Sequence, residues 1–166
     1  MRDEIFDVVN ERDEVITQLP RREVHRQGLK HRATHILIFN SKGEVFLQKR
    51  SMKKDNHPGV WDSSASGHVD AGEDYDRCAV REVFEELGVE LPCPPARVLR
   101  VEACNETGQE FVWVYRCTHE GPFVLHPEEI DTGAWFSPEL VARWISEKPH
   151  AFAPAFICIW KQLFPN

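Results

Sequence analysis

The chain has 166 residues, of which 42% are hydrophobic and 28% are charged, and its formal net charge is −7 at pH 7. This length predicts one domain over residues 1–166, with 1–30 as an N-terminal extension packed on it. The acidic balance argues against a nucleic-acid polymer or an anionic membrane as a partner, because both attract basic surfaces.

Two further features of the sequence bear on the cellular compartment. The first residues show no basic patch followed by an apolar run, as a secretory signal would, and no stretch approaches the roughly 18 apolar residues of a membrane span. The five cysteines are an odd number without a C-x-x-C pair, which is typical of reduced thiols. We therefore expect a cytoplasmic protein.

The first half of the chain predicts short strands, one short helix and a basic loop. Apolar runs bounded by polar turns indicate strands at 4–9, 14–19, 34–39, 44–48 and 61–66. Residues 21–28 form a candidate helix that carries His25, and the polar segment 51–58 contains several basic residues.

A longer helix is predicted from Asp74 to Leu87. Gly88 follows it, which is typical of a helix end, and its apolar residues recur with helical spacing at Val80, Val83, Phe84 and Leu87. Beyond a proline-rich loop, we expect strands at 97–103, 110–117 and 133–136 and helices at 138–146 and 152–164. Strands and helices mix without a regular repeat, so we predict an α/β fold in which helices cover a mixed β-sheet.

The helix at 74–87 places three carboxylates close together. At about 100° of rotation per residue, Glu82, Glu85 and Glu86 share one arc, opposite the apolar arc that would dock on the sheet. We expect these glutamates to face a cleft or solvent, and Cys78, near the same arc, to be partly exposed. A solvated charged face is one explanation, but like charges four residues apart repel each other. A hard divalent cation, which prefers carboxylate oxygens, would offset that repulsion.

The segment from Gly67 to Val89, GHVDAGEDYDRCAVREVFEELGV, extends this pattern. It matches G-x5-E-x7-R-E-U-x-E-E-x-G-U, where U is a bulky aliphatic residue, at every constrained position. The motif resembles that of the Nudix family. This resemblance implies an α/β/α sandwich and an attack of water on the diphosphate of a nucleoside diphosphate derivative, with the help of metal ions.

The same resemblance implies roles for individual residues. The expected ligands of Mg²⁺ or Mn²⁺ are the backbone carbonyl of Gly67 and the carboxylates of Glu82, Glu85 and Glu86. Arg81 would orient these glutamates through charge-assisted hydrogen bonds, with Glu73 as its partner. The general base would be Glu82 or Glu110.

The regions flanking this motif resemble isopentenyl diphosphate isomerase, a Nudix relative that moves a double bond by proton transfer. The resembling segments are 31–40, 48–54, 58–62 and 66–68. Metal-binding histidines would then correspond to His25, His31 and His68. The catalytic glutamate would correspond to Glu110, and the diphosphate-binding residues to Arg50 and Lys54.

The chain departs from the isomerase pattern at residues on which proton transfer depends. Ser66 stands directly before Gly67 and His68, where the isomerase has a cysteine, and a serine hydroxyl is a poor acid. Gly108 and Ala155 stand where the isomerase has a glutamate and a tryptophan. We therefore predict an isomerase-like Nudix hydrolase. The alternatives are an altered isomerase and a non-catalytic Nudix module that binds a ligand.

The expected partner is a small-molecule diphosphate. Contacts to this substrate are expected from Arg50, Lys54, His31, Ser66 and Glu73, and His68 is expected to contact the metal. Charged residues of this kind are also common as solvated side chains. Glu128 and Glu129 form an acidic pair that offers another general base. Many relatives dimerise, which makes a homodimer a further expectation.

Overall fold

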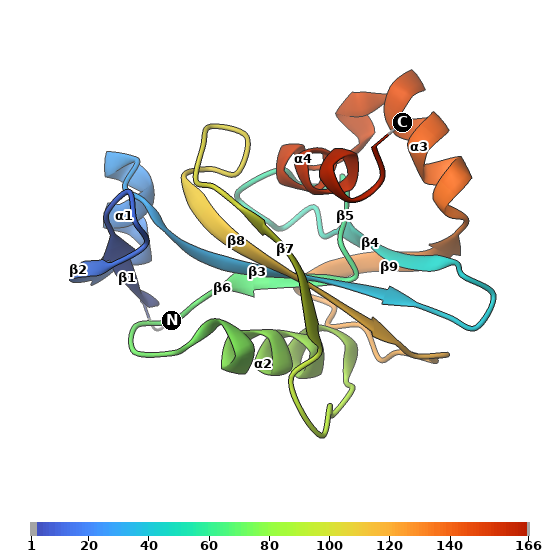
Figure 1. The fold of residues 1–166 in the computed structure, drawn as a ribbon, viewed down its shortest axis with the longest axis horizontal. Coiled ribbons are helices and arrows are strands. Elements are labelled where there is room, and N and C mark those ends of the chain that lie inside the picture. The colour runs from blue at the N-terminus through green and yellow to red at the C-terminus, as the bar shows by residue number, and fades with distance from the viewer. Residues whose placement is uncertain (1–2, 166) are drawn as a thin grey trace.

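The computed structural model describes residues 3–165 and shows a mixed β-sheet between two layers of helix (Figure 1). The strands of this sheet are β3 (His31–Phe39), β4 (Val45–Arg50), β5 (Trp61–Asp62), β6 (Ala65–His68), β7 (Ala96–Val101), β8 (Glu110–Thr118) and β9 (Ile130–Phe136). Their order is β5-β4-β3-β8-β7, with β6 paired to β3 and β9 paired to β4. A separate hairpin consists of β1 (Ile5–Val9) and β2 (Val15–Pro20).

Helices cover both faces of the sheet. They are α1 (Arg21–Gln27), α2 (Tyr75–Leu87), α3 (Pro138–Glu147) and α4 (Pro154–Leu163), with a 3-10 turn at Pro149–Ala151. Helix α2 packs on one face through a core that includes Val83 and Tyr115. Helices α3 and α4 pack on the other face, where Leu47 and Ile159 are buried. This arrangement confirms the predicted α/β fold with a mixed sheet.

The sheet is mixed because β3 and β8 run parallel, whereas its other neighbouring strands run antiparallel. His31 at the start of β3 lies opposite Glu110 at the start of β8. On the other side of β3, Ala33 lies opposite His68 of β6. Polar residues from three strands therefore meet at one end of the sheet.

The largest differences from the predicted strand boundaries lie at three places. Strand β3 begins at His31 and β9 at Ile130, three residues earlier than expected, because β8 and β4 offer backbone partners there. The extended segment predicted at 61–66 is divided into β5 and β6, and the buried Ser63 and Ser64 lie between them.

Helix α2 is capped at both ends by residues of the local sequence. The Asp74 side chain accepts a hydrogen bond of 2.8 Å from the backbone N–H of Arg77, which satisfies a free donor of the first turn. At the other end Gly88 adopts a φ of 72°, a left-handed conformation that glycine tolerates best.

The face that α2 presents to the sheet differs from the predicted one. Phe84 is 51% exposed, and Cys78 is fully buried, so the expectation of a partly exposed Cys78 is wrong. Glu82 and Glu86 are also buried and approach β6. The packed face of the helix therefore includes both carboxylates, and Gln48 and the Ser66 N–H of the sheet donate hydrogen bonds to Glu86.

The N-terminal hairpin braces the loop that precedes α2. Phe6 of the hairpin and Val24 of α1 belong to a small separate hydrophobic core. The buried carboxylate of Asp7 accepts a hydrogen bond of 3.0 Å from the backbone N–H of Gly72. The hairpin and α1 lie beside the start of β3 (Figure 1), where the ring centroids of His25 and His31 are 5.3 Å apart.

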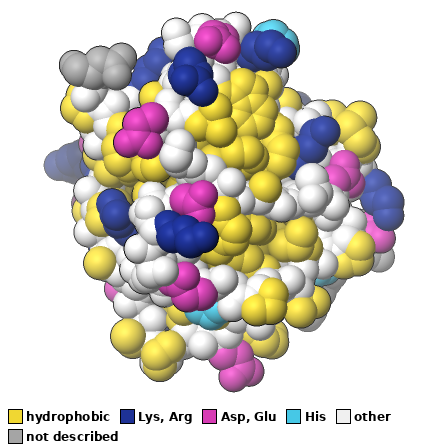
Figure 2. Space-filling view, turned by 90° about the vertical axis from the view of Figure 1, so that its right-hand side faces the viewer, with side chains coloured by type: hydrophobic (Ala, Val, Ile, Leu, Met, Phe, Trp, Pro, Cys, Tyr) yellow, Lys and Arg dark blue, Asp and Glu magenta, His cyan; other side chains and the backbone are white. Residues whose placement is uncertain are grey.

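The surface around α3 carries exposed apolar side chains. Figure 2 shows this side of the molecule, where apolar areas are bordered by charged side chains. A shallow groove of about 360 Å³ is lined by Phe136, Leu140, Arg143, Trp144, Glu147 and Lys148. Across residues 3–165, we find no helix with the length and apolar character that a membrane span requires. All five cysteines are free thiols.

Candidate active site

Arg81 of α2 organises a group of carboxylates. Its guanidinium binds both carboxylate oxygens of Glu73, each at 2.8 Å, which is the contact expected from the motif. It also donates to Glu82 at 2.7 Å, to Glu85 at 3.2 Å and to the backbone carbonyl of His68 at 3.0 Å. Such charge-assisted bonds fix the directions of the glutamates.

Glu86 and Glu82 are held between α2 and the sheet. One oxygen of Glu86 accepts hydrogen bonds from the Gln48 side chain at 2.8 Å and from the Ser66 backbone N–H at 3.1 Å. Glu82 lies against Gly67, where a Cβ atom would fall 2.1 Å from its carboxyl carbon. Glycine at position 67 is therefore required for this close approach.

The two buried carboxylates are unfavourable as free anions. Burial raises the pKa of Glu86 to about 7. Burial, followed by the charge of Glu86, raises the pKa of Glu82 well above its usual range, although Arg81 opposes this shift. Protonation of one carboxyl, or binding of a cation, relieves the repulsion between two such buried charges. Carboxylate oxygens are the donors that Mg²⁺ and Mn²⁺ prefer, so the residues present fit such an ion.

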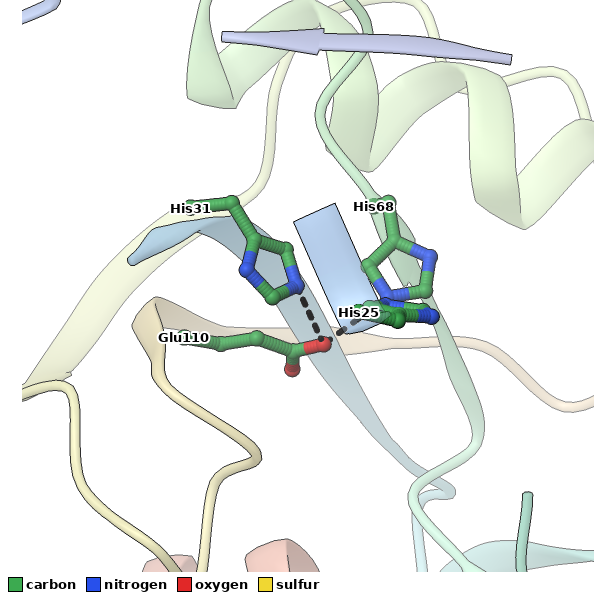
Figure 3. A group of neighbouring side chains, drawn as sticks. All are labelled: His25, His31, His68 and Glu110. Atoms are coloured by element: carbon green, nitrogen blue, oxygen red, sulfur yellow. Dashed lines mark ion pairs between the residues drawn. The ribbon is translucent and has the colours of Figure 1, made fainter. Parts of the chain in front are cut away.

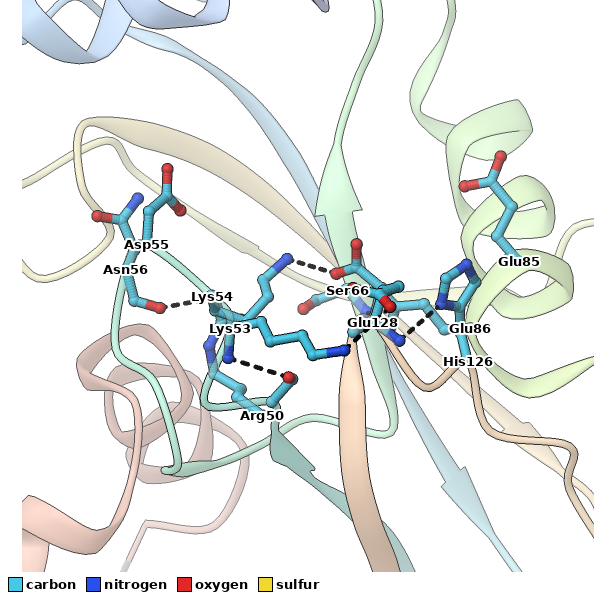
Figure 4. A network of polar contacts seen from close by, with 12 residues as sticks. Arg50, Lys53, Lys54, Asp55, Asn56, Ser66, Glu85, Glu86, His126 and Glu128 are labelled. Atoms are coloured by element: carbon cyan, nitrogen blue, oxygen red, sulfur yellow. Dashed lines mark hydrogen bonds and ion pairs between the residues drawn. The ribbon is translucent and has the colours of Figure 1, made fainter. Parts of the chain in front are cut away.

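A basic loop, residues 50–58, lies beside these carboxylates (Figure 4). We call Glu73, Glu82, Glu85 and Glu86, with Arg81 between them, the glutamate group. The Arg50 guanidinium donates to the carbonyl of Asn56 at 2.9 Å, which holds it in one orientation. The Lys54 ammonium contacts the carboxylate of Glu129. After the larger effect of burial, the charge of Lys54 slightly lowers the pKa of Glu86. The loop can therefore bring positive charge to an anionic substrate at the glutamates.

A second polar cluster consists of His25, His31, His68 and Glu110 (Figure 3). One ligand atom from each residue lies within 4.8 Å of the others. A Glu110 oxygen is 2.8 Å from Nε2 of His68 and 3.3 Å from Nε2 of His31. The Phe6 ring packs on this cluster, with its centroid 4.6 Å from that of His68.

The hydrogen bonds of His31 leave one contact of this cluster unsatisfied. Nδ1 of His31 lies 2.9 Å from the Leu29 carbonyl, an acceptor, so Nδ1 carries the hydrogen. The buried Nε2 of a neutral His31 then directs a lone pair toward Glu110, and no hydrogen-bond partner for it is found within the described residues. Facing acceptors require a proton or a metal ion between them.

The pKa shifts agree with a metal-binding donor set. Burial lowers the pKa of His25 to about 4, which leaves a neutral imidazole at pH 7. Burial alone would raise the pKa of Glu110, but the neighbouring His68 and His31 hold it well below its usual range. Imidazole nitrogens together with one carboxylate are a donor set that fits a transition metal such as Mn²⁺, Fe²⁺ or Zn²⁺.

Comparison with known proteins identifies the family. A family model described as NUDIX domain matches residues 29–156. The chain belongs to the Nudix family. An uncharacterized Nudix hydrolase of Yersinia pestis is 39% identical to it over 148 residues, which cover 87% of this chain and 79% of that protein.

Solved Nudix structures agree with the fold. The crystal structure of DR0079 from Deinococcus radiodurans superposes with a TM-score of 0.83 at 28% identity, covering 97% of this chain and 99% of that one. The NUDIX domain of Shewanella oneidensis NrtR, crystallised with ADP ribose, has a TM-score of 0.63 at 14% identity, covering 87% and 97% of the two chains. The second likeness is one of fold alone.

The residues singled out from the sequence fall into two groups in this Nudix fold. The first group contains Glu73, Arg81, Glu82, Glu85 and Glu86, together with Gly67 and the backbone of Ser66. The second group contains His25, His31, His68 and Glu110. Arg50 and Lys54 lie on the loop side of the first group (Figure 4).

Sequence reasoning missed Gln48, which holds the Glu86 carboxylate from β4. The sequence feature that could have indicated it is that Gln48 is a single polar residue at the end of the apolar run Val45–Gln48. A polar side chain in a buried strand requires a polar partner. The place of His25 in the cluster depends on how α1 packs beside β3, which local sequence does not encode.

Proposed function

We propose that this Nudix protein is a Mg²⁺- or Mn²⁺-dependent hydrolase of a diphosphate linkage in a nucleoside diphosphate derivative or a related small molecule. The observation that carries the proposal is the buried pair Glu82 and Glu86, oriented by Arg81 and Gln48. Nudix enzymes use divalent metal ions. A bound ion would neutralise the diphosphate and activate the attacking water.

The residues of the glutamate group would hold the ion and the basic loop would hold the substrate. The proposed ligands are Glu82, Glu85, Glu86 and the carbonyl of Gly67. Arg81, fixed by Glu73, keeps the carboxylates in position before substrate arrives, which is the preorganisation that charge stabilisation requires. Arg50 and Lys54 would bind phosphate oxygens, with Ser66 and Glu73 at the border of the site.

Two carboxylates are candidates for taking the proton from the attacking water. Burial, and then the charge of Glu86, raise the pKa of Glu82 above that of an ordinary carboxyl, which makes it a better proton acceptor. Glu110 is the alternative, although its contacts with His68 and His31 keep its pKa low. Glu82 is therefore the base that the site favours.

A second candidate is isomerisation of an isoprenoid diphosphate. The observation in its favour is the histidine cluster with Glu110, a donor set that fits a transition metal, as the resemblance to isopentenyl diphosphate isomerase implies. His31 and His68 would then hold a metal rather than substrate. The hydroxyl of Ser66 argues against this reaction because it is too weak an acid to protonate an alkene.

A third candidate is a Nudix module that binds a nucleotide without hydrolysing it. The NUDIX domain of Shewanella oneidensis NrtR was solved with ADP ribose, which makes this ligand a reasonable probe. The complete set of glutamates on α2 argues for catalysis.

We further propose that the protein is a single domain with an N-terminal extension and that it is cytoplasmic. Its partner would be a small molecule rather than a nucleic-acid polymer or a membrane, and it would form a homodimer.

One experiment separates the three functions. The protein is incubated with Mg²⁺ or Mn²⁺ and a panel of nucleoside diphosphate derivatives, ADP-ribose and isopentenyl diphosphate. Release of phosphate or nucleotide supports hydrolysis, and migration of the double bond supports isomerisation. Tight binding without turnover supports the ligand-binding module. Hydrolysis that persists unchanged in both Glu85→Gln and Glu86→Gln would exclude the assigned metal group.

A further inference from the structure

We propose that Asp62 is a positioning residue for the diphosphate substrate: it holds the side chain of Arg50 and thereby fixes the basic loop that binds phosphate oxygens. This inference rests on the phosphate role of Arg50 and Lys54 proposed above. Asp62 ends β5 and lies outside the Gly67–Val89 motif. It belongs neither to the glutamate group nor to the histidine cluster.

Arg50 closes the basic loop with both its side chain and its backbone. The guanidinium donates to the carbonyl of His57 at 3.1 Å and to that of Asn56 at 2.9 Å. The backbone N–H of Arg50 donates to the Val60 carbonyl at 2.8 Å. Figure 4 shows Arg50 and Asn56 with the two lysines of this loop. The start of the loop is therefore joined to its end through one residue.

The turn at His57 depends on these bonds. His57 has a φ of 48°, a left-handed conformation that is unfavourable for a residue other than glycine. A turn of this kind persists only when the surrounding contacts hold it. The bond from the Arg50 side chain to the His57 carbonyl is such a contact.

Asp62 is the carboxylate that faces the Arg50 guanidinium. Its Oδ2 atom accepts from a terminal nitrogen of Arg50 at 3.4 Å, and its side chain is only 5% exposed. Its Oδ1 atom accepts from the backbone N–H of Ser63 at 2.7 Å. A buried carboxylate requires a compensating charge. Within residues 3–165, Arg50 is the one lysine or arginine that forms an ion pair with Asp62.

His35 of β3 and Ser63 keep the carboxylate in place from the interior. Nδ1 of His35 lies 2.8 Å from the Ser63 hydroxyl and 3.7 Å from Oδ1 of Asp62. Burial lowers the pKa of His35, so its imidazole is neutral at pH 7 and leaves the charge of Asp62 to be balanced by Arg50. The interior of the sheet thus fixes the carboxylate, and the carboxylate fixes the loop.

A second aspartate–arginine pair joins the same loop to α1. Asp55 accepts two hydrogen bonds of 3.1 Å from Arg21, and these side chains are 63% and 28% exposed. The Asp62 and Arg50 side chains are 5% and 16% exposed. Exposed ion pairs contribute little to stability, whereas loss of one partner of a buried pair leaves an uncompensated charge. The buried pair therefore holds the loop, and the exposed pair is its matched control.

The conformation of the loop decides where its positive charges point. The Lys54 N–H donates to the Ser51 carbonyl at 3.2 Å, so this lysine follows the turn that Arg50 closes. A loop that is ordered before the substrate arrives avoids the cost of ordering on binding. The N–H donors of Arg50 that the protein does not use remain available to a phosphate oxygen. Asp62 thereby affects the affinity for a diphosphate without touching it.

The first test needs no ligand. Trypsin cleaves after lysine and arginine, so loosening of the basic loop exposes Lys53 and Lys54 to cleavage. Asp62→Asn in the full chain is expected to raise the rate of cleavage in this loop by at least about tenfold. Mass spectrometry identifies the fragments, and circular dichroism checks the fold. Asp55→Asn removes the same charge from the exposed pair and should leave the rate within about twofold of the wild type.

The second test is calorimetric titration with methylenediphosphonate, a diphosphate analogue that resists hydrolysis, at saturating Mg²⁺. Asp62→Asn is expected to weaken binding by about three- to tenfold, and Asp55→Asn should bind as the wild type does. Arg50→Lys breaks the same buried pair from the loop side and should weaken binding as well. In the Arg50→Lys background Asp62→Asn should add no further loss, because the contact is already absent. If Asp62→Asn does not fold, Arg50→Lys must show the increased cleavage.

Three results would overturn the role of Asp62. They are tighter binding in Asp62→Asn, which would mean that Asp62 only offsets the charge of Arg50, an equal loss in both backgrounds, and cleavage at the wild-type rate. The wild type separates this role from the proposed function. If the wild type does not bind methylenediphosphonate, the phosphate role of the loop is wrong. If it binds and Asp62→Asn matches it, only the role of Asp62 is wrong.

Discussion

The guanidinium of Arg81 donates a hydrogen bond of 3.0 Å to the backbone carbonyl of His68. The imidazole of the same His68 lies 2.8 Å from Glu110 in the histidine cluster. One residue of β6 is therefore in contact with both polar groups, through its backbone on one side and its side chain on the other. A movement of this strand would disturb the two groups together.

Replacing Arg81 with methionine should weaken the glutamate group and the fold. Glu73, Glu82 and Glu85 would lose their common partner, so we expect a loss of hydrolysis of about 10- to 100-fold. We also expect a loss of unfolding free energy of about 2 kcal/mol, because the carboxylates are left partly buried without compensation. Kinetics and urea denaturation measure the two effects. Arg77→Met is the control, since the side chain of Arg77 is 80% exposed on the same helix.

A methyl group added at Gly67 should displace Glu82. The Cβ atom would fall 2.1 Å from the Glu82 carboxyl carbon, so Gly67→Ala is expected to lower Mg²⁺ affinity while the fold is retained. Calorimetry and circular dichroism check the two statements. In the neighbouring Ser66→Ala variant Mg²⁺ affinity should stay near the wild-type value, because Ser66 binds Glu86 through its backbone. Wild-type affinity in Gly67→Ala would contradict the close approach.

The stability of the ion-free protein should depend on pH through Glu86. Burial raises the pKa of this carboxyl from the usual 4.5 to about 7, so the folded protein binds the proton more tightly than the unfolded chain. The contribution of Glu86 is therefore complete below about pH 4.5 and is lost as pH rises through 7, with a magnitude of about 3 kcal/mol.

Thermal unfolding in the presence of a chelator tests this dependence between pH 5 and 8. Glu86→Gln should flatten the profile in this window. Added Mg²⁺ should reverse its direction, since the ion binds the deprotonated carboxylate and competes with the proton. A wild-type profile that coincides with that of Glu86→Gln would contradict the raised pKa.

The histidine cluster should bind a transition metal independently of α2. Removing one imidazole in His68→Ala or His31→Ala is expected to lower affinity for Zn²⁺ or Mn²⁺ by at least about tenfold, as loss of a ligand does. Mg²⁺ binding at the glutamates should persist, which separates the two sites. Metal content after dialysis and competition with a chelator provide the measurement. His150→Ala, at an exposed position, is the control.

The glutamate group was largely predictable because its residues are close in sequence. Arg81, Glu82, Glu85 and Glu86 share one helix, and the spacing to Glu73 fixes the loop before it. Helical periodicity alone placed Val83 and Leu87 correctly on the packed face of α2 but was wrong for Phe84, Glu82 and Glu86. It counts carboxylates as exposed, whereas the Gln48 side chain and the Ser66 backbone N–H donate hydrogen bonds to the buried Glu86.

The histidine cluster was less accessible to sequence reasoning. His31 and Glu110 are 79 residues apart, and the parallel pairing of β3 with β8 brings them together. No local pattern encodes that register. The resemblance to an isomerase named the histidines, but their contacts with Glu110 and the cover provided by Phe6 come from tertiary packing.

The stretch that marks this chain as a Nudix protein begins at residue 29, whereas His25 and Phe6 precede it. A version shortened to that stretch would keep every acidic group of α2 but would lose one imidazole and the aromatic cover of the others. The family match and the complete histidine cluster thus have different borders along this polypeptide, because Phe6 of β1 and His25 of α1 lie before the first and belong to the second.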